Sequence, residues 1–132
     1  ATIIDVYSTA DVHILTDVLA CTGEGSFNIT WHPSLMVEQT IMVSDNKNVT
    51  VTGTGLSSSV RGALADGNTD NTNDDGGGNG MFSVSNGSIL RLNDLVLEGG
   101  RADTGGAVEV LSNSSLFLFG CTFRKNNASK GG

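Results

Sequence analysis

The stretch GMFSV at residues 80–84 decides the fold, because its pattern returns 26 residues later as GAVEV at residues 106–110. The same offset aligns LRL at 90–92 with LFL at 116–118, without a gap. A fixed period of this length, built from short apolar runs and polar turns, is typical of solenoid proteins. In such proteins each repeat buries its apolar side only by stacking on its neighbours.

Within each repeat, apolar residues alternate with other residues in three short runs, which is the pattern of a strand with one buried face. Asn, Ser, Gly and Asp lie between the runs, as turns require. We therefore predict an all-β fold, a right-handed parallel β-helix with three short strands per coil. An antiparallel sandwich also has regularly spaced strands, but it does not explain the constant offset. The runs cover residues 82–84, 90–92, 95–97, 108–110, 116–118 and 121–123.

The N-terminal region differs from the repeats. Residues 2–7 have the pattern of a strand, and residues 8–20 that of an amphipathic helix with Val12, Leu15 and Leu19 on one face. Ser8 and Asp11 have the spacing of a capping box, with Asp in place of Glu. A strand and a helix here would cap a solenoid end, which otherwise exposes apolar surface and unpaired backbone groups.

The chain of 132 residues is predicted to form a single domain. In the segment before the regular repeats, alternation at 27–31, 37–43 and 49–51 predicts further strands, and we align 48–53 with 95–100. We expect the C-terminal end to be open, completed by further solenoid coils or by another copy. The predicted divisions are 1–25 (cap), 26–79 (irregular coil), 62–80 (acidic loop within that coil), 80–105 (repeat coil) and 106–132 (uncapped repeat coil).

Composition excludes some partners. A formal net charge of −7 argues against nucleic acid or an anionic membrane surface, and no apolar run has the length of a membrane span. Five N-x-[ST] sequons favour an extracellular, secreted or cell-surface protein carrying N-linked glycans. The candidate acceptors are Asn28, Asn48, Asn86, Asn113 and Asn127.

Two cysteines are too few for a disulfide framework. Cys121 takes the place of Leu95 in the repeat, which indicates a small buried apolar residue. Cys21 follows the predicted helix, roughly two coils away, so we expect the two thiols to be unpaired with each other.

The last third of the chain, about residues 80–132, resembles the repeats of polymorphic outer membrane proteins. FRKN at 123–126, followed by Ala128 and the final Gly pair, is similar to their FxxN element, and GGAV at 105–108 is similar to their GGA-[ILV] element. The resemblance implies a right-handed β-helix of the pectate-lyase-like type in a surface-exposed or secreted protein, often linked to adhesion. The preceding repeat departs from it, with LEGG at 97–100 in place of FxxN.

Residues for catalysis are sparse. Glu109 lacks the second carboxylate that a glycosidase needs, and neither His13 nor His32 has the spacing of a zinc site. We therefore predict no catalytic residues and no enzyme activity. The alternative is a carbohydrate-binding or polysaccharide-modifying β-helix in which outward Glu109, Arg91 and Trp31 form a groove with the acidic loop.

The acidic loop offers the one possible metal site. Asp66, Asn68, Asp70 and Asp74 stand at relative positions 1, 3, 5 and 9, as in a calcium-binding loop. Gly and the bidentate Glu are missing at positions 6 and 12, so a solvated loop without a cofactor is the alternative, and the one we favour.

If Leu116 and Leu118 point inward, Phe117 and Phe119 point outward, side by side. Two adjacent exposed aromatic residues at an open end predict a contact surface, unless a nearby loop covers them. We therefore expect a non-catalytic structural or adhesive module that assembles end to end into a filament or belongs to a longer solenoid. A weaker alternative is an ice- or mineral-binding face, for which only Thr50 and Thr52 form a pair.

Overall fold

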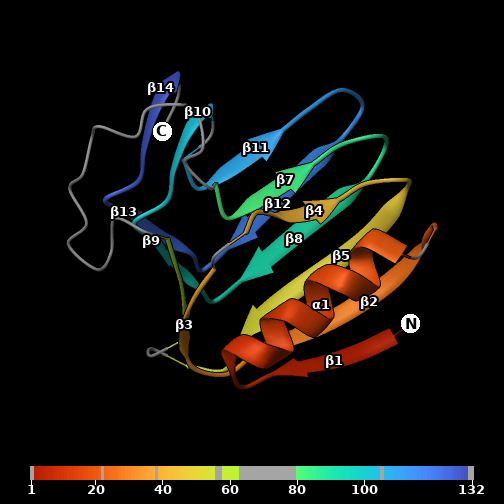
Figure 1. Cartoon of the computed structure of the whole chain (residues 1–132), viewed down its shortest axis with the longest axis horizontal. Coiled ribbons are helices and arrows are strands. Elements are labelled where there is room, and N and C mark those ends of the chain that lie inside the picture. Colours follow the sequence, from red (N-terminus) through yellow and green to blue (C-terminus); the bar gives the residue numbers. More distant parts are fainter. Residues whose placement is uncertain are drawn as a thin grey trace.

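The computed structural model describes residues 2–21, 23–37, 39–55, 58–62, 80–104 and 106–130, the side chains of 101–104 and 127–130 excepted. This part of the chain is mostly β-structure with one helix, α1 (Thr9–Cys21), and its strands pair in parallel (Figure 1). The prediction of an all-β, parallel architecture is confirmed.

The strands form four sheets, and the chain returns to each sheet after passing through others. The five-stranded sheet, called the main sheet below, consists of β1 (Thr2–Val6), β2 (Gly25–Trp31), β5 (Lys47–Gly53), β8 (Ile89–Asn93) and β12 (Ser115–Phe119). The four-stranded sheet consists of β3 (Ser34–Met36), β6 (Ser59–Arg61), β9 (Val96–Glu98) and β13 (Thr122–Arg124). The three-stranded sheet consists of β4 (Ile41–Val43), β7 (Phe82–Val84) and β11 (Val108–Val110). A two-stranded sheet consists of β10 (Arg101–Thr104) and β14 (Asn127–Lys130).

The 26-residue offset is a strand register. Leu90 pairs with Leu116 in the main sheet, and the same offset aligns β7 with β11 and β9 with β13. The alternating residues of each strand therefore lie directly over those of its neighbour, as the sequence predicted.

The number of strands per repeat was predicted incorrectly. Each of the last two repeats contains a fourth strand, β10 or β14, and these two strands pair at the same offset. Their sequences, RADT and NASK, contain no apolar alternation. They are joined by backbone hydrogen bonds, which leave no hydrophobic pattern to detect.

The alignment of residues 48–53 with 95–100 was also wrong. In the structure β5 lies between β2 and β8, so Val49 pairs with Leu90 rather than with a residue of 95–100. The segment predicted as one irregular coil thus enters the main sheet twice, through β2 and β5. A run that alternates with a period of two can be aligned with any strand of the fold. The constant sequence offset would have identified β8 as the neighbour of β5, but the long segment between β6 and β7 interrupts that offset.

The alternating run at 37–43 does not form a single strand. β3 ends at Met36 and β4 begins at Ile41, so the chain moves from one sheet to another within the run. Val37, Ile41 and Val43 are buried, whereas Gln39 is exposed.

The N-terminal strand and helix form as predicted. The capping box is present: the Asp11 amide donates to Ser8 Oγ at 3.3 Å, and the Ser8 amide donates to Asp11 Oδ2 at 3.2 Å. The helix is amphipathic, and its buried residues Val12, Leu15 and Leu19 join the core. The helix packs against β1 and β4, which ties the N-terminal segment to two different sheets.

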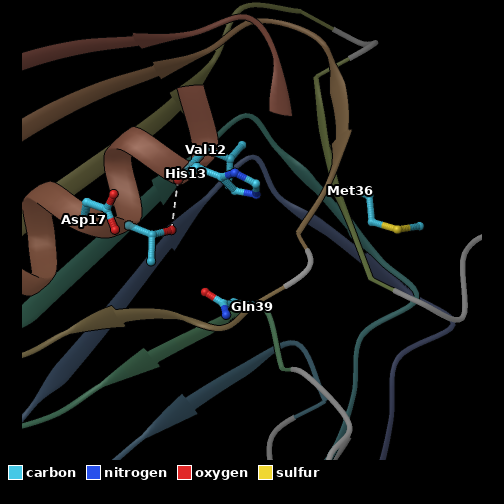
Figure 2. Close-up of a pocket in the computed structure, with 6 residues that line it drawn as sticks. Val12, His13, Asp17, Met36 and Gln39 are labelled. Carbon is cyan, nitrogen blue, oxygen red and sulfur yellow. Dashed lines mark hydrogen bonds between the residues drawn. The ribbon is translucent and has the colours of Figure 1, made fainter. Parts of the chain in front are cut away.

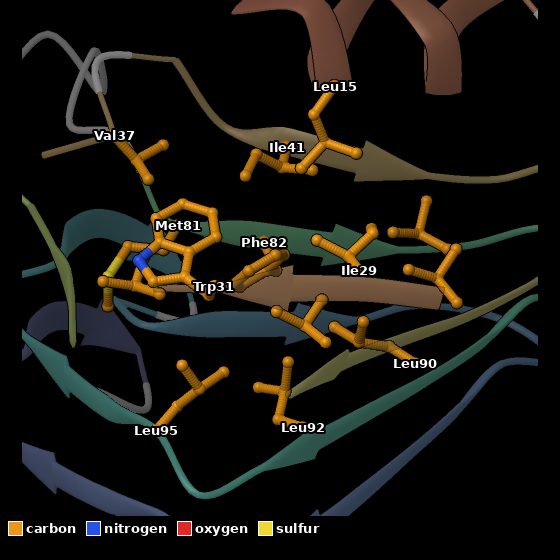
Figure 3. Packing of buried hydrophobic residues seen from close by; sticks show 14 of the residues in the cluster. Leu15, Ile29, Trp31, Val37, Ile41, Met81, Phe82, Leu90, Leu92 and Leu95 are labelled. Carbon is orange, nitrogen blue, oxygen red and sulfur yellow. The ribbon is translucent and has the colours of Figure 1, made fainter. Parts of the chain in front are cut away.

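The core runs between the sheets and consists of their inward residues, with Leu15 of α1 close to Ile41 (Figure 3). Trp31 is fully buried, and its indole N–H donates to the carbonyl of Ser59 at 3.0 Å. Because a buried indole N–H without an acceptor is costly, this bond fixes the large side chain and links the main sheet to the four-stranded sheet.

The turns of successive repeats are connected at two places. Asp94, which ends the β8 pass, has a φ of 55°, and Gly120 occupies the equivalent place one repeat later with a φ of 66°. Glycine adopts this left-handed conformation without strain, and a Cβ at Gly120 would also collide with the Asp94 carboxylate. Asn126 reaches back to the preceding repeat, where it accepts from the Gly100 amide at 2.8 Å and donates to the Leu97 carbonyl at 3.0 Å.

Candidate interaction surface

All four sheets stop at an edge strand on the same side of the fold. These strands are β11, β12, β13 and β14, the last strand of each sheet in chain order (Figure 1). The outer edge of each carries backbone groups that the next parallel strand would engage. Each of these four strands therefore has a strand neighbour on one side only.

Inward residues of two of these strands are exposed. Leu118 is 49% exposed, whereas Leu92, its partner in the preceding strand, is fully buried. Phe123 is 40% exposed, whereas its partner Leu97 is fully buried. We call this surface the open end; its exposed large apolar residues are Val110, Leu111, Phe117, Leu118, Phe119 and Phe123.

The prediction that Phe117 and Phe119 are exposed is confirmed: Phe117 is 53% exposed and Phe119 is 73% exposed. The Arg91 guanidinium lies over the Phe117 ring, 5.1 Å from its centroid, and donates to Asn48 Oδ1 at 2.8 Å. One face of Phe117 thus contacts a cation of its own chain. The acidic loop, which is the nearby loop that could cover the pair, lies outside the described residues.

The predicted glycan acceptors lie in two kinds of place. Asn28 is exposed on β2, and Asn48 is half-buried on β5, beside Arg91. Asn86 and Asn113 are exposed in turns, each with a φ in the left-handed region, 53° and 61°. Asn127 begins β14, where side chains are not among those described.

The groove of the alternative function does not form as predicted. Trp31 is buried rather than outward. Arg91 lies on the main sheet, whereas Glu109 lies on the three-stranded sheet, where its Oε1 accepts from Ser83 Oγ at 3.5 Å. The outward placement of Trp31 was wrong because Trp31 alternates with Phe27 and Ile29, and all three side chains lie on the buried face of β2.

The two histidines occupy separate sites. His32 stacks on the Tyr7 ring, with centroids 4.0 Å apart, and its Nε2 lies 3.1 Å from Asp5 Oδ1. His13 lines an open pocket of about 540 Å³ between α1 and the β3–β4 connection (Figure 2). Asp17 and Gln39 also line that pocket. The Thr16 hydroxyl, which lines it too, donates to the Val12 carbonyl of its own helix. Among the described residues that line the pocket there is no Ser or Cys, and no group of three metal ligands.

Both cysteines are free thiols in the structure: Cys21 is exposed and Cys121 is half-buried against the core. The possible calcium ligands Asp66, Asn68, Asp70 and Asp74 lie outside the described residues, so the calcium site and the favoured solvated loop both stay predictions. Within the described ranges, no three His, Cys, Asp or Glu side chains are grouped so that they could hold a metal ion.

Sequence reasoning found the outward aromatic pair but missed the exposed inward residues of the same strands. Leu118 and Phe123 carry the same pattern as their buried partners, so alternation alone cannot separate them. The signal was present in the expectation of an open end, because a strand without a neighbour leaves its inward side chains only half covered.

Comparisons with known proteins give no relative for this chain: no family model, no curated protein and no solved structure matches it. The resemblance to polymorphic outer membrane protein repeats therefore stays a prediction. Within the described ranges, no helix has both the length and the apolar character needed to cross a membrane.

Proposed function

We propose that this chain is a non-catalytic structural or adhesive module of a secreted or cell-surface glycoprotein, and that its open end stacks on a further β-coil. In this proposal the four sheets are the faces of a right-handed parallel β-helix. The observation that carries it is that four edge strands lie on one side of the fold and that the inward residues Leu118 of β12 and Phe123 of β13 are exposed there.

The strand pairings support the β-helix. Neighbouring strands are parallel, and the chain enters the main sheet five times with other sheets between the visits. Parallel neighbours joined by a crossover are nearly always right-handed. Turn residues in the left-handed conformation recur between passes, at Asn46, Asn86 and Asn113 before strands of the main sheet, as expected where a ribbon turns sharply on every coil.

A binding role for the open end follows from its energetics. Fully burying a Leu or Phe side chain is worth about 1.5–3 kcal/mol relative to leaving it in water. A coil continuing the register would cover Leu118 and Phe123 as Leu118 and Phe123 themselves cover Leu92 and Leu97. It would also pair the exposed backbone groups of the edge strands, which otherwise invite unspecific association.

An extended chain tests this role. A second copy of residues 107–132 is appended after Gly132, so that the 26-residue register continues. We expect higher resistance to denaturant, a larger m-value, and slower amide exchange in β12 and β13, because the added coil buries their apolar face. The matched control carries Asp at the two positions of the added coil that correspond to Leu116 and Leu118. An extension that exchanges freely and adds no stability would refute the proposed stacking.

Secretion and glycosylation are tested separately. We expect the chain, directed through a eukaryotic secretory route, to lose mass on treatment with an N-glycosidase. Replacement of Asn28, Asn86 or Asn113 by Gln should each remove one glycan, since these side chains are exposed. A secreted product whose mass the enzyme does not change would contradict the glycoprotein part of the proposal.

A further inference from the structure

The main sheet ends in two edge strands that match each other. β1 is its first strand and β12 its last, and each has five residues. All neighbours in this sheet are parallel, so the two free edges are complementary: the outer edge of β12 presents the groups that the outer edge of β1 would accept in a parallel ladder.

The register of the sheet defines columns of outward side chains that cross all five strands. In one column only the two edge positions are apolar: Ile3 is 73% exposed and Phe117 is 53% exposed. Exposed apolar residues on edge strands favour pairing with another strand. From β1 to β12 that column reads Ile3, Asn28, Thr50, Arg91 and Phe117.

Continuing the same register beyond β12 would place Ile3 of a second copy beside Phe117. It would also place Ile4 of that copy beside Leu118, because Ile4 and Leu118 occupy one inward column. Ile4 is half-buried and packs against the core of its own chain, while Leu118 is 49% exposed. Both the outward and the inward columns therefore gain apolar contacts from one strand pairing.

The two ends of the chain also carry opposite charge. Residues 1–25 contain four acidic and no basic residues, whereas residues 107–132 contain three basic residues and one acidic residue. Contact between unlike ends brings opposite charges together, which steers association and fixes orientation. Contact between two open ends would instead bring two basic segments together.

The helix leaves the free edge of β1 in place. α1 directs Val12, Leu15 and Leu19 into the core beside β1 and β4. In Figure 1 β1 lies at the outer margin of the main sheet, and α1 contacts β1 and β4. The helix thus covers the interior at this end, while β1 keeps its position as an edge strand.

We infer that the partner of the open end is a second copy of this chain, joined head to tail, with β12 of one copy pairing in parallel with β1 of the next. This inference rests on the proposed coil stacking and names its occupant. Because the two surfaces are unlike, the contact leaves one open end on every assembly, and the product is an open filament rather than a closed dimer.

Disulfide trapping tests the pairing. Ile3→Cys and Phe117→Cys are combined in a chain whose own cysteines are replaced by Ser; Ser at 121 can keep the hydrogen bond that Cys121 donates to the Leu92 carbonyl. Within one molecule positions 3 and 117 are four strand spacings apart, about 19 Å, too far for a disulfide. Under mild oxidation we expect a ladder of covalent dimers, trimers and larger species from the double variant, and monomers from either single variant.

Two results would overturn the inference. Covalent dimers from the Phe117→Cys variant alone would mean that two open ends meet, and a double variant that stays monomeric would mean that β12 does not meet β1. If the appended coil described above still stacks, head-to-tail pairing falls while the proposed function stands. If neither experiment succeeds, both fall.

A second measurement uses the native cysteines and no trapping. Sedimentation of the unmodified chain should show concentration-dependent association that weakens as salt is raised. Ile3→Ser and Phe117→Ser should each weaken it at least about tenfold, the change that 1.4 kcal/mol of lost contact produces. Met42→Ser is the matched control: Met42 is 47% exposed on β4, outside the main sheet, and should leave association unchanged. If all three substitutions weakened association equally, the contact between copies would not be the pairing of β12 with β1.

Discussion

Leu92 and Leu118 occupy the same column of the main sheet in adjacent strands, yet one is fully buried and the other is half in water. The same contrast separates Leu97 from Phe123 in the four-stranded sheet. Leu92 and Leu118 do not differ in type, strand position or direction. They differ in the number of neighbouring strands, since β8 lies between two strands and β12 has one. In this fold the burial of an inward residue therefore depends on whether strands lie on both sides of its own strand.

The largest expected effect tests that contrast directly. Leu92→Ala should lower the free energy of unfolding by about 2–5 kcal/mol, because it leaves a cavity in a packed core. Leu118→Ala should cost less than about 1.5 kcal/mol, because part of its side chain is already in water. Denaturant titration of dilute, monomeric protein measures both. Equal losses would mean that the open end is covered in solution, and the contrast between the two layers would fail.

A smaller effect concerns the bond that holds the terminal layer to the preceding one. Asn126→Ala removes the partners of the Leu97 carbonyl and the Gly100 amide and should cost about 1–3 kcal/mol. Amide exchange should rise first in β13, next to Asn126 in the chain. Asn93→Ala is the matched control: its amide contacts Thr52 Oγ1 at 3.4 Å on a partly exposed face, and its loss should stay near 0.5 kcal/mol. If Asn93→Ala lowered the free energy of unfolding more than Asn126→Ala, the two hydrogen bonds of Asn126 would not be what holds the terminal layer to the preceding one.

The smallest expected effect is the contact between Arg91 of the inner layer and Phe117 of the terminal one. A double-mutant cycle with Arg91→Met and Phe117→Leu should give a coupling energy of about 0.5–1 kcal/mol, the usual value of a cation–π contact at an exposed site. Arg91→Lys should retain part of it while losing the planar hydrogen bond to Asn48. A coupling indistinguishable from zero would mean that Phe117 is free of its own chain and wholly available to a partner.

Sequence reasoning predicted the regular repeats well because their signal is redundant. Alternation identified the strands, and the 26-residue offset fixed their register, so the pairing of Leu90 with Leu116 followed from the printed residues alone. The capping box at Ser8 and Asp11 was also local, since it depends on two side chains one helical turn apart. Among the candidate site residues, the exposed pair Phe117 and Phe119 followed from alternation once Leu116 and Leu118 were directed inward.

The failures have a common cause. β5 was assigned to the wrong neighbour because any alternating run fits any strand, and an insertion removed the constant offset. β10 and β14 were missed because their pairing uses only the backbone. Trp31 was given an outward role although its ring is buried and bonded to Ser59. In each case the deciding contact joins residues far apart in the sequence.

By itself the sequence determined the local strand pattern, the direction of each side chain within the regular repeats and the spacing at which those repeats stack. The tertiary structure decided which strands are neighbours across the insertion, which inward residues are covered, and that β1 and β12 are the two free edges of one sheet. The physical reason is that side-chain direction follows from the backbone of a single strand. Burial and pairing depend on whether a second strand, distant in the chain, lies about 4.8 Å away.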